Sequence, residues 1–122
     1  MAQDRALPAA ARFSRARFGA RTRLIDRLVA VGATITEILG NNPNRVAWLI
    51  ENRGVNNSAI GSTRDLTFAN GLKLGADGGF ASMDVQEDGE ATTYAQFGIS
   101  DVAAVNHRVL EIVTDREDVA RS

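Results

Sequence analysis

His107 is the only histidine in the chain, and histidine is the side chain best suited to acid–base or ligand chemistry near neutral pH. The chain has no cysteine, which excludes disulfides, thiolate nucleophiles and thiolate metal sites. Ser–His catalysis would therefore rest on His107 alone, and no serine lies in a nucleophile-elbow sequence. A histidine at the end of a strand is more often a packing or surface residue than a catalytic one. We therefore predict no catalytic residue and no enzymatic activity.

Four carboxylates crowd the segment DVQEDGE, at Asp84, Glu87, Asp88 and Glu90. Clustered carboxylates and turn carbonyls suit a hard cation such as Ca²⁺, but their order does not match the EF-hand loop. An acidic solvated turn is the simpler interpretation, and contact with the arginines of a neighbouring copy is the alternative that we prefer to calcium. The glycine-rich segment 75–79 lacks the lysine and the helix start of a phosphate loop. We predict no metal and no cofactor.

The net charge of −1 hides a division along the chain. Residues 1–28 carry seven arginines against two aspartates, a balance of 7 − 2 = +5, whereas residues 29–122 carry seven bases against thirteen acids, a balance of 7 − 13 = −6. Nearly all of the basic charge is arginine, whose planar fork suits carboxylates and phosphates. A basic arm on an acidic body predicts docking onto another acidic surface, including that of a neighbouring copy.

The arm alternates arginine with phenylalanine, and its predicted partner-binding residues are Arg12, Phe13, Arg15, Arg17, Phe18, Arg21 and Arg23. Such a pattern also suits phosphates and stacked bases, although the acidic body would oppose close approach to DNA. Ala9–Arg17 fits a helix whose apolar face is thin, so we expect the first 23 residues to stay unstructured until they dock. A solvated tail with no partner stays open as an alternative.

The body is organised around the segment Asn41–Asn57, in which turn residues flank an apolar run. Val46, Trp48 and Ile50 share one face of the expected strand, and Trp48 is the only tryptophan. The preceding segment, Leu24–Leu39, is ambiguous. We read it as a short helix or extended segment up to Val31, followed by a strand over Thr34–Leu39.

Short apolar pieces recur after the central strand, with Asn70-Gly71, Asp77-Gly78-Gly79 and Asp88-Gly89 among the dividers; the pieces are 59–60, 66–68, 72–74, 80–85, 94–99 and 108–113. Asn-Gly and Asp-Gly between apolar residues favour hairpins. We therefore predict an all-β fold, a small antiparallel β-sandwich of jelly-roll-like type with an extended or partly helical N-terminal arm. The predicted core includes Trp48, Ile50, Leu74, Phe97 and Leu110.

The chain of 122 residues is expected to form one domain, residues 29–122, preceded by the arm at residues 1–28. No apolar run approaches the roughly 20 residues of a membrane span. The arginine-rich start lacks the apolar stretch of a signal peptide, so we expect neither membrane insertion nor a secretion signal.

Residues 38–75 resemble a small β domain of tailed-bacteriophage structural proteins. The pattern is an apolar step, then Asn-Pro-Asn-Arg, an apolar strand ending in Asn, a strand containing Gly, and a Gly-apolar-x-Leu step. Here these are Ile38-Leu39, Asn42–Arg45, Val46–Asn52, Ile60-Gly61 and Gly71–Leu74. The later strands match in number and spacing alone. The motifs are turn chemistry and not active-site chemistry.

The resemblance implies a virion structural protein, assembled in the host cytoplasm, and more narrowly a capsid decoration or minor head protein. Its implied partners are the major capsid protein or other virion proteins and further copies of itself, with a trimer favoured. A tail-tip or baseplate component is the alternative within this class. Outside it stand a nucleic-acid-binding protein that uses the arm and a carbohydrate-binding sandwich, which would need an exposed aromatic such as Tyr94.

Overall fold

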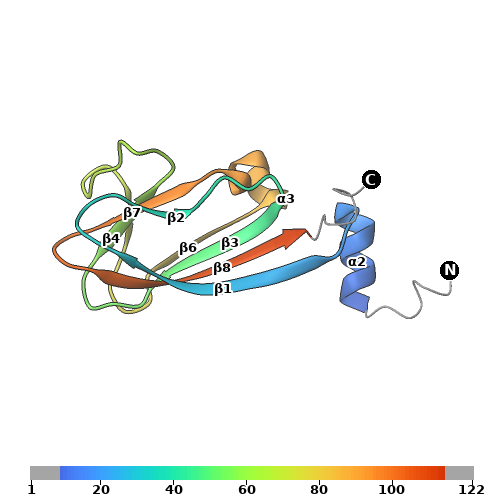
Figure 1. Cartoon of the computed structure of the whole chain (residues 1–122), viewed down its shortest axis with the longest axis horizontal. Coiled ribbons are helices and arrows are strands. Elements are labelled where there is room, and N and C mark those ends of the chain that lie inside the picture. The colour runs from blue at the N-terminus through green and yellow to red at the C-terminus, as the bar shows by residue number, and fades with distance from the viewer. Residues whose placement is uncertain (1–8, 115–122) are drawn as a thin grey trace.

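The computed structural model describes residues 9–114 and is built from two four-stranded antiparallel sheets (Figure 1). The first sheet has the order β1 (Thr22–Val31), β8 (Val105–Thr114), β3 (Arg45–Asn52) and β6 (Phe80–Asp84). The second has the order β2 (Thr36–Leu39), β7 (Gln96–Ser100), β4 (Ser58–Gly61) and β5 (Leu72–Leu74). Helix α2 (Ala9–Phe18) precedes β1, and the short helices α3 (Val85–Asp88) and η1 (Gly89–Thr93) join β6 to β7.

The strand order is that of a jelly roll. Only β4 and β5 follow one another within the same sheet, and every other connection passes from one sheet to the other. Two interleaved four-stranded sheets of this kind define the jelly-roll sandwich. The predicted fold class, a small antiparallel β-sandwich, is confirmed.

The core lies between the two sheets because alternate residues of each strand point inward. In β8 the inward positions are buried and most of the intervening ones are exposed. The central apolar cluster draws on strands of both sheets and on residues far apart in the chain; it consists of Val31, Ile38, Leu39, Trp48, Ile50, Ile60, Leu74 and Val109. Trp48, with 4% of its surface exposed, is its largest member.

Two residues expected in the core lie outside its central cluster. Phe97 is buried but points to the outer side of the second sheet, because its neighbour Gly98 occupies the inward position against Val31 and Ile38. Leu110 is half-buried on the outer face of the first sheet, where the alternation of β8 must place it between the inward Val109 and Glu111.

The expected hairpins were largely wrong. Asp77 and Gly78 both have positive φ, at 58° and 118°, as the sequence suggested, yet the turn joins strands of different sheets. Asp88-Gly89 ends helix α3, with Gly89 as its C-cap. Residues 66–68 form no strand and belong to the loop between β4 and β5. Local turn chemistry sets backbone angles, but it does not choose which strands pair.

The N-terminal region also differs from expectation. Leu24–Val31, read as a short helix or extended segment, is the greater part of β1, which pairs with β8 from Thr22↔Thr114 to Val31↔Val105. The boundary expected after residue 28 therefore falls inside a strand. The helix considered for Ala9–Arg17 is present as α2, so this part of the segment expected to be unstructured is folded; residues 1–8 lie outside the described part.

Candidate functional site

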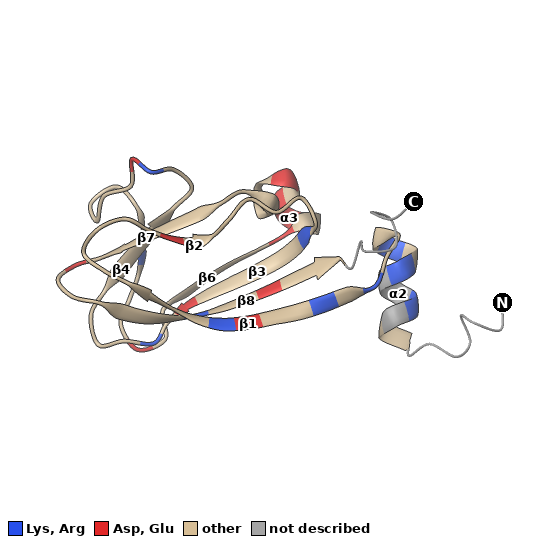
Figure 2. Cartoon of the chain, viewed as in Figure 1, with Lys and Arg blue, Asp and Glu red and all other residues tan. Residues whose placement is uncertain are grey.

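The arginine-rich segment lies at one end of the sandwich. Figure 2 shows α2 outside both sheets, next to the start of β1. The helix ends at Gly19, which has a φ of 73° and donates its N–H to the Arg15 carbonyl at 2.9 Å. Ala20, 7% exposed, then leads the chain into β1. We call the arginines of this region the basic segment; they are Arg12, Arg15, Arg17, Arg21 and Arg23.

Five of the seven residues predicted to bind a partner are exposed, namely the arginines of the basic segment. Phe18 is half-buried, and the Phe13 side chain lies outside the described part. The side chains of Arg17, Arg21 and Arg23 form no ion pair with any residue in the described range. Arg17, Arg21 and Arg23 are therefore exposed basic groups with no acidic partner among residues 9–114.

The four carboxylates of DVQEDGE, which we call the acidic turn, surround α3. Asp84 caps this helix by accepting the Glu87 N–H at 2.9 Å, and Asp88 accepts the Asp84 N–H at 3.0 Å. Glu87 and Glu90 are exposed, and none of the four pairs with a described arginine. Figure 2 places the acidic turn toward the same end of the sandwich as α2. Residues 9–114 hold no group of three or more acidic or histidine side chains suited to a metal ion.

An ion-pair network lies between the sheets, with Glu111 and Arg45 buried and Arg27 partly exposed. Glu111, 4% exposed, accepts from Arg45 Nε at 2.7 Å and from Arg27 Nη1 at 2.8 Å. The Arg45 guanidinium also donates to the Gly40 carbonyl at 2.7 Å, and Arg27 donates to the Ile38 carbonyl at 2.5 Å. The network thus joins three strands of the first sheet to the end of β2.

A β-bulge aims Arg45 inward. The pairing of β3 with β8 shifts between Arg45↔Val113 and Ala47↔Ile112, so that Val46 is the extra residue. Arg45 and Trp48 consequently both point into the sandwich, although strict alternation would place them on opposite faces. Glu111, the acid that Arg45 contacts, is 66 residues away along the chain, and no signal in the sequence connects the two.

His107 is fully buried and contacts Ser58 across the two sheets, with Nε2 and Oγ 2.7 Å apart. Its Nδ1 lies 2.9 Å from the Val105 carbonyl, so Nδ1 carries the proton and Nε2 accepts from the Ser58 hydroxyl. Burial lowers the pKa of His107, opposed by the hydrogen bond to the Val105 carbonyl. Both side chains are 0% exposed, so this Ser–His pair lies out of reach of a substrate.

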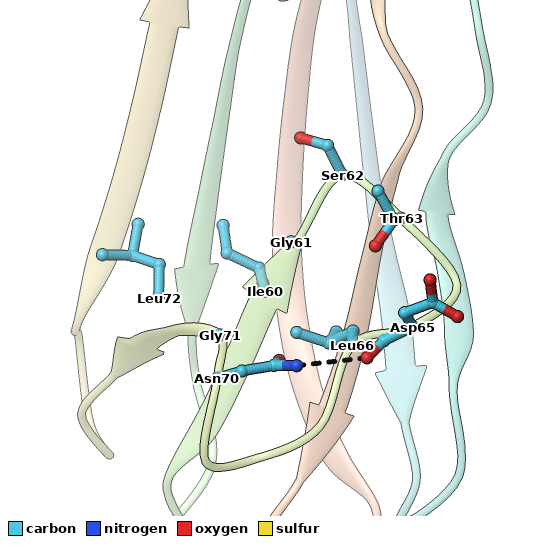
Figure 3. Close-up of a pocket in the computed structure, with 9 residues that line it drawn as sticks. All are labelled: Ile60, Gly61, Ser62, Thr63, Asp65, Leu66, Asn70, Gly71 and Leu72. Atoms are coloured by element: carbon cyan, nitrogen blue, oxygen red, sulfur yellow. Dashed lines mark hydrogen bonds between the residues drawn. The ribbon is translucent and has the colours of Figure 1, made fainter.

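The loop between β4 and β5 borders a shallow groove of about 410 Å³ (Figure 3). Its lining combines the apolar residues Ile60, Leu66 and Leu72 with the polar residues Ser62, Thr63, Asp65 and Asn70. The side-chain amide of Asn70, which lines the groove, already donates a hydrogen bond to the Asp65 carbonyl at 3.2 Å. Asp65 is the one carboxylate of the lining, so the groove lacks the paired groups of acid–base catalysis.

Aromatic residues suited to a sugar are poorly placed. Trp48 is buried in the core and is unavailable to a ligand. Tyr94, with 49% of its surface exposed, stands beside η1, and its backbone carbonyl lies 3.4 Å from Arg45 Nη1. None of the helices in the described part has the length and apolar character needed to cross a membrane.

No family model matches the chain, and no curated protein matches it. A solved structure from work on Bacillus endospore appendages, described as a novel family of disulfide-linked pili, is similar to it over 76% of this chain and 86% of the other. The two share 14% sequence identity, with a TM-score of 0.43. Unlike a disulfide-linked protein, this chain has no cysteine.

Proposed function

We propose that this protein is a non-enzymatic structural subunit of a phage-like particle, a capsid-associated decoration or minor head protein that docks through its N-terminal segment. The observation that carries the proposal is the exposed basic charge of Arg17, Arg21 and Arg23, which lie on a helix and strand start outside the core and pair with no acid among residues 9–114. Such charge suits bidentate contacts with carboxylates of an adjacent subunit.

The acidic turn is the matching surface on a neighbouring copy. Glu87 and Glu90 are exposed and unpaired with described residues, so they remain available to another chain. Opposite charges that are not neutralised within one molecule favour association between molecules. The place in a virion rests on the resemblance of residues 38–75 to phage structural domains.

Charge reversal tests the docking. We expect Arg17→Glu with Arg21→Glu to abolish incorporation into particles and to weaken self-association at low salt, while the fold is kept because both side chains are exposed. Glu87→Arg with Glu90→Arg should have the same effect, and mixing the two reversed chains should restore association. Arg64→Glu, on the exposed Arg64–Glu37 pair, is the control. Normal incorporation of the arginine-reversed chain would refute the role of the segment.

The same arginines suit a nucleic acid, which is the alternative of another class. That alternative predicts duplex binding that weakens steeply with salt. Reversal of Arg17 and Arg21 should abolish this binding, whereas reversal of Glu87 and Glu90 should leave it unchanged.

A tail-tip or baseplate position is distinguished by copy number, because a shell protein occurs in far more copies per particle than a tail component.

A further inference from the structure

The outer face of the first sheet carries an unusual number of exposed apolar side chains. Leu24, Leu28 and Phe80 are 61%, 66% and 64% exposed, and Ile112 is 39% exposed. Leu110 and Leu49, half-buried, fill the middle of the same face. Contiguous apolar surface of this kind on a folded chain marks an interaction site.

The registers of the four strands arrange this face in rows that run across the sheet from β1 to β6. One row reads Leu28, Arg108, Glu51 and Phe80. The next row reads Asp26, Leu110, Leu49 and Ser82, and the third reads Leu24, Ile112, Ala47 and Asp84.

The first of these rows is complementary to its own reversal, and the middle of the other two is apolar. In the first row an apolar residue stands at each end, and a base and an acid stand between them. A two-fold axis parallel to the strands, between β8 and β3, places Leu28 over Phe80 of the other copy and Arg108 over its Glu51. The middle row then sets Leu110 on Leu49 and Asp26 on Ser82. The third row sets Ile112 on Ala47 and Leu24 beside Asp84. No like charges face one another in this arrangement.

We infer that two copies of the chain pack face to face through the outer surfaces of their β1–β8–β3–β6 sheets. Packed sheets of this type cross at about 30°, so the central residues superpose best and the corner residues reach one another through their long side chains. The contact is isologous, in which each copy uses the same patch. This contact gives a dimer and not the trimer expected from the sequence. The inference does not depend on which particle contains the protein.

Two ion pairs on this face are compatible with a contact between two copies. Arg108 lies 2.5 Å from Asp26, and Arg53 lies 3.3 Å from Glu51, each within one copy and each exposed. When two copies meet, Arg108 and Glu51 extend these pairs into a network across the axis. The apolar residues of the rows supply most of the contact area, and the charged residues fix which of the possible registers forms.

The mass of the full chain in solution, from sedimentation equilibrium, tests the pair. We expect a dimer, and we expect Leu28→Glu and Phe80→Glu each to give a folded monomer by circular dichroism, since both side chains are exposed. Val55→Glu is the matched control, because Val55 is 81% exposed in the loop after β3 and should leave the dimer intact. A wild-type monomer or trimer, or a dimer that survives both substitutions, would overturn the proposal.

Cysteine pairing tests the register, since the chain has no cysteine of its own. A mixture of Leu28→Cys and Phe80→Cys chains, treated with a short bis-maleimide, should give a cross-linked dimer. Leu28→Cys alone, and Leu28→Cys mixed with Val55→Cys, should not. Cross-linking of Leu28→Cys with itself would place the axis elsewhere and contradict the arrangement. Reversal of Arg17 and Arg21 should leave this cross-link unchanged, which separates the face contact from the docking of the N-terminal segment.

Discussion

At the scale of single residues, Glu111 is the carboxylate that joins the two arginines of the ion-pair network. Its two carboxylate oxygens accept from Arg45 and Arg27, and all three side chains point between the sheets. Burying these charges is costly by itself, and only their mutual contacts and the backbone acceptors offset that cost. The network therefore depends on each of its members.

We expect Glu111→Gln to lower the free energy of unfolding by about 3–5 kcal/mol, because it leaves Arg45 buried without a countercharge. Urea unfolding followed by Trp48 fluorescence measures the change. Glu37→Gln is the control, because the Glu37–Arg64 pair is 3.5 Å long and exposed, and its loss should cost less than about 1 kcal/mol. Equal losses for the two variants would contradict the assigned role of Glu111.

His107 makes stability depend on pH. Its pKa in the folded chain is lowered by burial from 6.5, so the unfolded chain binds the proton first as the pH falls. The contribution of neutral His107 to the free energy of unfolding is therefore fully present above pH 6.5. Below pH 6.5 it declines, by up to about 1.4 kcal/mol per pH unit, until the pH reaches the pKa of His107 in the folded chain.

The variant His107→Gln isolates this contribution, because it leaves all carboxylates in place. The difference in unfolding free energy between the wild type and His107→Gln should be constant above pH 6.5 and shrink below it. Chemical denaturation at a series of pH values measures the difference. A difference that does not vary with pH would show that His107 does not titrate differently on folding.

At the scale of elements, the alternation of apolar residues predicted where most strands lie. The strand at Arg45–Asn52 and those near the C-terminus followed from β-branched and aromatic residues between turn formers. Strand partners could not be predicted in this way. Asp77-Gly78 and Asp88-Gly89 carry hairpin chemistry, yet they sit in connections between sheets, because long-range packing and not the local turn decides the pairing.

The loop between β4 and β5 is an element that the sequence did not reveal. Leu66, 5% exposed, packs where Gly61 and Gly71 leave room for it, on the outer side of the second sheet. A Cβ at Gly71 would lie 2.5 Å from Leu66 Cδ1 and 2.8 Å from Ala59 Cβ. The loop is therefore held by a small apolar cluster of its own.

We expect Gly71→Ala to destabilise the protein by about 1–3 kcal/mol through this overlap. Thermal unfolding compared with Gly75→Ala provides the check, since a Cβ at Gly75 meets nothing within 4 Å. If the two variants unfolded at the same temperature, the close packing of Leu66 against Gly71 would be wrong.

At the scale of the whole molecule, charged and apolar surfaces are exposed in the described part of the chain. The charge division predicted the basic segment and the acidic turn, because composition along the chain is enough to find them. The apolar outer face could not be predicted. Leu24, Leu49 and Leu110 meet only through the registers of three strands that lie far apart in sequence.

The most direct test of an assembly role is a cryo-electron microscopy map of the native particle or complex that contains this protein. We predict copies paired through the outer faces of their β1–β8–β3–β6 sheets, with Arg17, Arg21 and Arg23 against carboxylates of an adjacent subunit. Isolated copies with both the apolar face and the basic segment exposed to solvent would contradict the account.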